Sequence, residues 1–170
     1  MVGLQGKDDW SVVPKSYIEG LTAAKNGQPE QAIKLFSSTV SAHPDFSPAY
    51  VNLGLQYLQL KQYEPAERSF KKSIELNPDN PASFHYLGVI ARFSGDFDLA
   101  KKMYLKSIDL YPDYAIAHLN LGILQDMYLH EFEQALDHYE TYQSLLDKKD
   151  AKVSKWIIDI KRRIAKSKKS

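Results

Sequence analysis

The sequence predicts an all-α protein, an α-solenoid built from stacked helix–turn–helix hairpins. Glycine recurs at a period of 34 residues, at Gly20, Gly54, Gly88 and Gly122. Each glycine is followed at nearly fixed offsets by an alanine and then by an aromatic residue. A repeat of this length is one supersecondary unit that buries its apolar face only by stacking on its neighbours. The repeat therefore predicts several small stacked cores.

Small and aromatic residues occupy the positions where the two helices of each hairpin meet. The alanine lies 12 residues after the first three glycines, and the aromatic residue follows four residues later. The fourth repeat has one extra residue before its alanine. Small side chains let two helices approach closely, and the aromatic ring fills the space towards the next hairpin. The predicted packing residues are Gly20, Gly54, Gly88, Gly122, Ala32, Ala66, Ala100, Ala135, Phe36, Phe70, Tyr104 and Tyr139.

Turn and cap residues set the ends of the helices. Ser47 and Asn80 each precede a proline, a combination typical of an N-cap followed by the first turn of a helix. Gly27 and Gly95 are expected in the turn inside their hairpins, where a positive φ is useful. Proline lacks an N–H and disfavours helix in the residue before it, so it ends a second helix. The closing prolines are Pro44, Pro78 and Pro112.

These signals divide the chain into four repeats, 13–46, 47–80, 81–114 and 115–149. An amphipathic helix over about 151–166 follows, with Val153, Trp156, Ile157, Ile160 and Ile164 at helical spacing. We expect residues 150–170 to form a capping helix and a basic tail, and residues 1–12, which lack a helical period, to form a flexible lead-in. The outward face of the capping helix is predicted to carry Lys152, Lys155, Arg162, Arg163 and Lys166.

The charge of the chain is unevenly distributed. Residues 1–147 contain 12 basic and 19 acidic residues, a net charge of −7, whereas residues 148–170 contain 10 basic and 2 acidic residues, a net charge of +8. There is no cysteine, which excludes disulfides, thiolate metal sites and cysteine nucleophiles. The sequence contains no apolar run long enough to span a membrane and no signal peptide. These features predict a cytoplasmic protein, or a periplasmic or envelope-associated one if a signal sequence has been removed.

The spacing of glycine, alanine, aromatic residue and proline over 13–149 resembles the tetratricopeptide repeat (TPR) family. The resemblance implies a right-handed superhelix of hairpins that binds a protein or peptide as a scaffold or adaptor. The fourth repeat and the capping helix are also loosely similar to small bacterial TPR proteins of the cell envelope.

In the TPR family the first helix of each hairpin lines a concave binding surface. Carried over to this chain, the family's inward-facing positions are mainly apolar and aromatic, which suits an amphipathic helix or an extended peptide. An equally weighted interpretation for Leu21, Leu55, Val89 and Ile123 is that they only pack hairpin against hairpin. The peptide-binding groove implied by the resemblance consists of Tyr17, Leu21, Val51, Asn52, Leu55, His85, Tyr86, Val89, Arg92, Leu119, Asn120 and Ile123.

Nothing in the sequence predicts catalysis, a cofactor or a metal site. No hydrolase, phosphate-loop or dinucleotide motif occurs. His118 takes the position that Ser16, Tyr50 and Phe84 have in the other repeats, so we interpret it as a packing residue. His130 and His138 lie eight residues apart with no carboxylate that completes a metal-binding pattern. We therefore expect a protein that is not an enzyme.

The expected partner is a protein or peptide. The lysine and arginine positions with which chaperone-binding TPR domains clamp a C-terminal carboxylate hold Tyr17, Ala82 and Tyr86 here, which argues against a chaperone peptide. Nucleic acid is disfavoured by the acidic body. Two alternatives remain open: self-association as a homodimer, and contact of the basic tail with an anionic surface.

Overall fold

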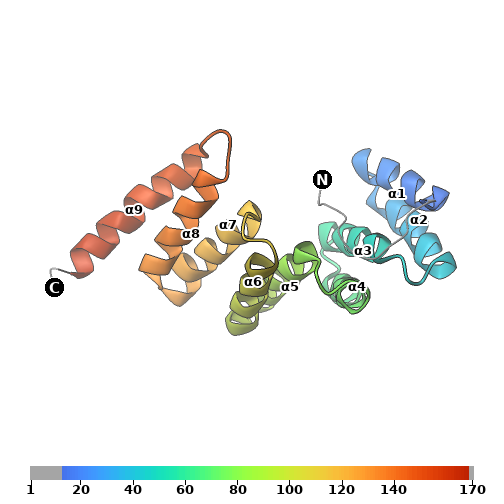
Figure 1. Cartoon of the computed structure of the whole chain (residues 1–170), viewed down its shortest axis with the longest axis horizontal. Coiled ribbons are helices and arrows are strands. Elements are labelled where there is room, and N and C mark those ends of the chain that lie inside the picture. Colours follow the sequence, from blue (N-terminus) through green and yellow to red (C-terminus); the bar gives the residue numbers. More distant parts are fainter. Residues whose placement is uncertain (1–12, 169–170) are drawn as a thin grey trace. The chain divides into compact units, whose positions relative to one another are not determined.

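The computed structural model describes residues 13–168, and the expected lead-in at 1–12 lies outside them. The described residues form nine α-helices and one short π-helix (Figure 1). The chain divides into two compact units, Met1–Leu87 and Gly88–Ser170, with the boundary inside α5. We call these the N-terminal unit and the C-terminal unit. The elements are α1 (Lys15–Lys25), α2 (Pro29–Ala42), α3 (Ser47–Gln59), α4 (Tyr63–Leu76), α5 (Pro81–Ser94), α6 (Phe97–Leu110), α7 (Ala115–Leu124), the π-helix η1 (Gln125–Leu129), α8 (Phe132–Ser144) and α9 (Ala151–Ser167).

A glycine and an aromatic ring pack against each other inside every hairpin. In the first hairpin, a Cβ atom added to Gly20 would lie 2.6 Å from the ring of Phe36. In the fourth, a Cβ atom on Gly122 would lie 2.8 Å from the ring of Tyr139. Gly54 with Phe70 and Gly88 with Tyr104 repeat this contact. Since any side chain on the first helix would displace the ring, glycine is what allows the ring to lie directly on the helix.

The same turn position has a positive φ in all four hairpins. Gly27 and Gly95, which the sequence places in turns, have φ values of 70° and 83°. Lys61 and His130 have φ values of 57° and 56° at the corresponding places. The turn geometry is therefore common to all four repeats, although only two of them use the residue that adopts it without steric cost.

Hydroxyl groups join consecutive helices of the N-terminal unit. Ser47 begins α3 and is buried, and its Oγ donates to the carbonyl oxygen of Ser73 on α4 at 3.2 Å. The hydroxyls of Ser73 and Ser83 lie 2.9 Å apart. The prediction that Ser47 is an N-cap is wrong, because its side chain points into the contact between helices. Asn80 does act as a cap, since its Oδ1 accepts from the backbone N–H of Ala82 at 3.0 Å.

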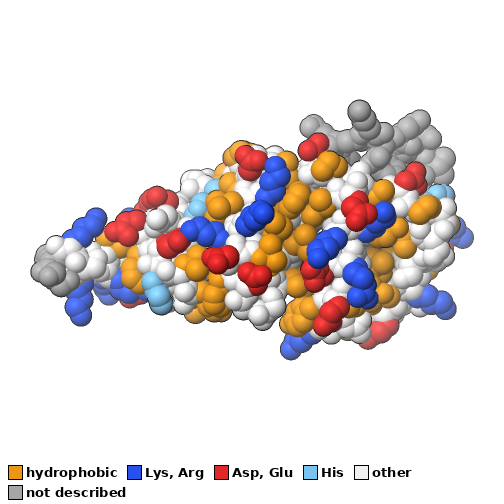
Figure 2. Space-filling view, turned by 90° about the horizontal axis from the view of Figure 1, so that it is seen from below, with side chains coloured by type: hydrophobic (Ala, Val, Ile, Leu, Met, Phe, Trp, Pro, Cys, Tyr) orange, Lys and Arg blue, Asp and Glu red, His pale blue; other side chains and the backbone are white. Residues whose placement is uncertain are grey.

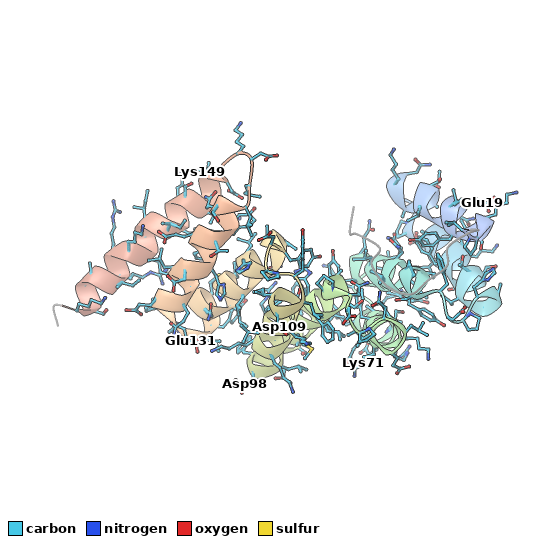
Figure 3. All side chains as sticks on the ribbon, in the orientation of Figure 1. Glu19, Lys71, Asp98, Asp109, Glu131 and Lys149 are labelled. Atoms are coloured by element: carbon cyan, nitrogen blue, oxygen red, sulfur yellow. The ribbon has the colours of Figure 1, made fainter. Side chains whose placement is uncertain are left out.

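The extra residue of the fourth repeat is absorbed by the π-helix η1. This wider turn continues α7 and ends at His130 in the left-handed region. Gln125 at its start donates to Glu131 at 3.1 Å, and Lys101 of α6 donates to both carboxylate oxygens of Glu131 at 2.6 and 2.7 Å. These bonds lower the pKa of Glu131, with the bond from Lys101 as the main cause. Figure 3 shows Glu131 just before α8. The insertion thus leaves the helix pair intact, as is usual for a π-bulge.

Helix α9 packs against α8 and closes the C-terminal unit. Its Val153 and Ile160 are fully buried against Ala135 and Tyr139. The carboxylate of Asp150 caps the helix by accepting from the backbone N–H groups of Lys152 and Val153. The α8 end is tied to this cap by Gln143, whose Nε2 donates to the carbonyl oxygen of Asp150 at 2.7 Å. Helix α9 therefore has a defined position on α8.

Candidate functional site

The first helices of the N-terminal unit form a surface, defined here as the α1–α3 face. It carries Tyr17, Ile18 and Leu21 of α1 and Val51, Asn52 and Leu55 of α3. Asn52 Nδ2 donates to the hydroxyl oxygen of Tyr17 at 2.9 Å and to the carbonyl oxygen of Pro48 at 2.9 Å. The structure thus brings Tyr17 and Asn52 together and shows that they bond to each other. Burial raises the pKa of Tyr17, and the bond from Asn52 opposes part of that rise.

The ring of Tyr17 is also an internal packing group. It meets the ring of Phe46 edge-on at a centroid distance of 4.9 Å and lies 5.7 Å from the ring of Phe36. Tyr17 is only half-buried, so part of the ring remains accessible. The more accessible apolar side chains on α1 are Ile18, 53% exposed, and Leu21, 40% exposed. Val51 and Leu55 of α3 are half-buried.

His85 and Tyr86 of α5 face the interior of the N-terminal unit. Tyr86 stacks on Phe70 at 5.3 Å, and burial raises the pKa of Tyr86. His85 lies edge-on to Tyr86 at 4.7 Å and is only 2% exposed. The expectation that His85 contacts a ligand is therefore not supported by its position. His85 corresponds to Tyr17, Val51 and Leu119 in the other repeats, and like Tyr17 it packs against a neighbouring ring.

In the C-terminal unit most of the expected groove positions pack against helices. Val89 packs against the cluster around Tyr104, and Leu119 and Ile123 pack against the cluster around Tyr139. Val89 and Ile123 therefore pack between helices, as the alternative interpretation of these residues predicted. Asn120 is half-buried.

Arg92 lies at the end of α5 and interacts with two aromatic residues. Burial raises the pKa of Tyr104, and part of that rise is opposed by the positive charge of the nearby Arg92 guanidinium. The guanidinium also lies 5.0 Å from the centroid of the Phe93 ring. Phe93 itself is 59% exposed. Arg92 therefore joins the interior of the hairpin to an exposed aromatic ring.

An ion pair that sequence reasoning missed joins η1 to α9. Arg163 Nη2 donates to the carboxylate of Asp126 at 2.6 Å, and Tyr139 donates to the same carboxylate at 3.3 Å. Asp126 is 8% exposed. The guanidinium also lies 4.8 Å from the centroid of the Phe132 ring. The prediction that Arg163 belongs to the outward face of the capping helix is therefore wrong. The signal in the sequence was Asp126, a charged residue within the apolar first half of the fourth repeat. This is also the repeat that contains the extra residue.

Other cations of the C-terminal segment pair with carboxylates of α8. Lys161 lies 2.6 Å from Glu140, and Lys168 lies 4.0 Å from Glu133. Both pairs are largely exposed, so each contributes at most about 1 kcal/mol. On the face shown in Figure 2, hydrophobic side chains lie between side chains of both charges. Two positive charges at the C-terminal end of the chain are therefore paired with negative charges of α8.

His118 and His138 form a hydrogen-bonded pair between α7 and α8. Their Nδ1 atoms lie 2.9 Å apart, and His118 Nε2 lies 2.9 Å from the carbonyl oxygen of Pro112. Because a carbonyl only accepts, His118 Nε2 carries the proton, and its Nδ1 accepts from His138 Nδ1. Burial and the neighbouring His118 lower the pKa of His138 to about 4. The ring of His138 is therefore neutral at pH 7. Within residues 13–168, no group of three His, Asp or Glu side chains is arranged to hold a metal ion.

This pair predicts a loss of stability in mild acid. Folding favours the neutral form of His138, so its contribution is complete above pH 6.5 and falls as the pH drops from 6.5 towards 4. We expect a decrease of about 1–2 kcal/mol in the free energy of unfolding over that range, allowing for the partial exposure of the ring. Urea unfolding at pH 7.5 and 4.5 measures it. His138→Gln keeps a hydrogen-bond donor without titrating and should reduce the decrease, whereas exposed His43→Gln should not. Equal losses in the wild type and His138→Gln would refute this assignment.

Comparison with known proteins identifies the repeat. Three family models described as tetratricopeptide repeat match residues 47–80, 69–102 and 87–144. A crystal structure of MamA superposes with a TM-score of 0.66 at 24% identity, covering 74% of this chain and 73% of that one. A structure titled MamA AMB-1 gives a TM-score of 0.71 at 21% identity, covering 91% of this chain and 83% of that one.

At these identities the likeness to MamA concerns the fold. A comparison with curated protein sequences finds no match. Across residues 13–168, every helix is too short or too polar to cross a bilayer. The family matches, the sequential packing of helix pairs and the closing helix α9 agree with one another. The chain belongs to the tetratricopeptide repeat family.

Proposed function

We propose that this protein is a non-catalytic scaffold that holds another protein through the α1–α3 face. Tetratricopeptide repeats mediate protein–protein interactions. The observation that carries the proposal is the row of apolar side chains on α1, where Ile18 and Leu21 remain 53% and 40% exposed. Large apolar side chains exposed side by side are typical of surfaces that bind a partner.

The geometry of this face suits a helix or an extended peptide. Ile18 and Leu21 lie three residues apart, so they share one side of α1. Tyr17 and Asn52 hold each other through their hydrogen bond, which fixes the polar part of the face before a partner arrives. A preformed surface loses little conformational entropy on binding. The partner is therefore expected to supply apolar anchors that cover Ile18 and Leu21.

The basic C-terminal segment is better explained as part of the cap than as a contact with an anionic surface. Arg163, Lys161 and Lys168 all pair with carboxylates of the same unit. Cations already matched within the fold contribute less to the attraction of phosphate groups.

A pair of charge substitutions tests the α1–α3 face. Ile18→Lys with Leu21→Lys should weaken binding of the retained partner by about tenfold or more, because two apolar contacts are lost and two charges must be desolvated. The partner is first identified by affinity capture on the wild-type protein, and its affinity is then measured with purified components.

The matched control is Leu99→Lys with Leu105→Lys, which alters two leucines on α6 that are 41% and 45% exposed. Both double variants should keep the wild-type circular dichroism and unfolding midpoint. If the α1 variant binds as tightly as the α6 variant, the α1–α3 face is not the binding surface. Light scattering of the unliganded protein separates this result from self-association through the same residues.

A further inference from the structure

A groove lies between α8 and α9, on the flank of the C-terminal unit. It has a volume of about 460 Å³. Glu140 contributes one wall, and Ile157, Ile158 and Lys161 contribute the other. Lys149, in the loop that joins the two helices, lies at one end (Figure 3). The hydrogen bonds that join Gln143 to Asp150 hold the two helices together at that end.

The register of α9 follows that of α7 with an offset of 35 residues. The extra residue in the fourth repeat separates Tyr104 from Tyr139 by 35, and the same offset places Trp156 at the position of Leu121. The contacts agree, because Trp156 lies 5.6 Å from Tyr139 while Leu121 packs in the cluster of Tyr104. The groove residues of α9 are Ser154, Ile157, Ile158 and Lys161, and they then correspond to Leu119, Gly122 and Ile123 of α7 and to Asp126 of η1.

Those four positions of α7 and η1 are the ones on which the following helices pack. Leu119 and Ile123 pack against the cluster formed by α8 and α9, and Gly122 lies beneath the ring of Tyr139. Asp126 bonds to Tyr139 and Arg163. The groove side of α9 therefore corresponds to the side of α7 against which the following helix packs. No helix among residues 13–168 covers this side of α9. A helix that entered the groove would continue the interface by which α8 packs on α7.

Helix α9 has a large side chain at the position where the first helix of each hairpin has a glycine. In the four hairpins the first helix has a glycine, and the second helix places an aromatic ring on it. In α9 the corresponding residue is Ile157, which fills the space that a ring would need. Close packing then requires a small residue on the entering helix.

The charge of the groove favours a partner that carries carboxylates. Lys161 takes the place that Asp126 has in η1, so the sign of the charge at this position is reversed. The groove has two lysines, Lys149 and Lys161, for one acidic residue, Glu140. Since Glu140 already pairs with Lys161 at 2.6 Å, the surplus positive charge lies at Lys149.

We propose that the groove between α8 and α9 is a second docking site, which takes one helix of another protein. That helix has a small residue opposite Ile157 and acidic residues towards Lys149. The site lies wholly within the C-terminal unit and is separate from the α1–α3 face.

A peptide made from the chain's own α8 tests whether the groove requires a small residue opposite Ile157. Its acidic residues Glu133, Asp137 and Glu140 are opposite in charge to the lysine at the end of the groove. The ring of Tyr139 packs directly on Gly122 in the fold. Fluorescence anisotropy with labelled residues 131–145 compares the native peptide with its Tyr139→Ala form. The wild-type protein should bind the alanine form about tenfold more tightly, a difference that steric exclusion of a ring readily produces.

Substitutions in the protein reverse or weaken that preference. Ile157→Gly restores a glycine at this position, so the protein should then bind the native peptide more tightly than the alanine form. Ile157→Ala, which keeps helix propensity, should shift the ratio of the two affinities in the same direction. Lys149→Glu should weaken binding of the alanine form about tenfold, whereas Lys148→Glu, which is outside the groove, should leave it unchanged. Ile18→Lys with Leu21→Lys should also leave it unchanged. Failure of both peptides to bind, or a peptide preference that does not respond to Ile157, would overturn the proposal.

Discussion

Replacing Phe70 by alanine is expected to lower the free energy of unfolding by about 3–5 kcal/mol. Phe70 is fully buried between Gly54 of its own hairpin and the stacked ring of Tyr86. Neither neighbour is able to fill the space that the ring leaves, because Gly54 has no side chain and Tyr86 is held in α5. The variant should therefore keep a cavity in the N-terminal unit. Urea unfolding followed by circular dichroism measures the loss.

Two further variants separate a packing effect from a general loss of hydrophobicity. Phe93→Ala removes a ring that is 59% exposed and should change stability by less than about 0.5 kcal/mol. Gly54→Leu alone should destabilise the fold, because its Cβ atom would lie 2.8 Å from Phe70. Combined with Phe70→Ala it should cost less than the sum of the two single changes, since the leucine then enters the vacated space. Strict additivity would mean that the glycine and the ring do not share one packing site.

Replacing Arg163 by alanine is expected to lower the free energy of unfolding by about 2–3 kcal/mol, because it leaves a buried carboxylate without its partner. Asp126 is 8% exposed, whereas the Arg163 side chain is 39% exposed, which moderates the loss. The change also removes the contact with the ring of Phe132. Since Arg163 is on α9 and Asp126 is on η1, the packing of α9 should be the first part to loosen. Hydrogen exchange of α9 amides, together with urea unfolding, measures this.

The neighbouring Arg162→Ala is the matched control, since Arg162 is exposed, and it should leave stability nearly unchanged. Asp126→Asn combined with Arg163→Ala should recover part of the loss, because a neutral amide costs less to bury than an unpaired carboxylate. If Arg163→Ala and Arg162→Ala unfold at the same urea concentration, the ion pair does not stabilise the attachment of α9.

The repeat was readable from the sequence because a solenoid is a local structure. The 34-residue period predicted an all-α fold of stacked hairpins, which is confirmed. The closing prolines lie just beyond the ends of α2, α4 and α6, since proline acts on the residues next to it. The hydroxyl of Ser47 was misread, because its bond with Ser73 on another helix leaves no local signal.

The candidate surfaces were less predictable. Tyr17 and Asn52 share a face, as their positions in the repeat indicated, yet they bond to each other. His85 proved to be buried, and Arg163 proved to be paired with a carboxylate 37 residues away. These outcomes depend on which side chain lies opposite, and a period specifies positions without specifying partners.

The order of the helix pairs, the closing helix and the uneven distribution of charge could all be predicted from the amino-acid sequence alone. Period, small residues, aromatic residues and prolines act within one hairpin or between adjacent ones, so they can be read along the chain. The three-dimensional packing was needed to show which polar and charged groups are buried, how η1 absorbs the extra residue and that a groove lies between α8 and α9. Those properties depend on contacts between helices, where burial and electrostatics are set by neighbours that are distant in sequence.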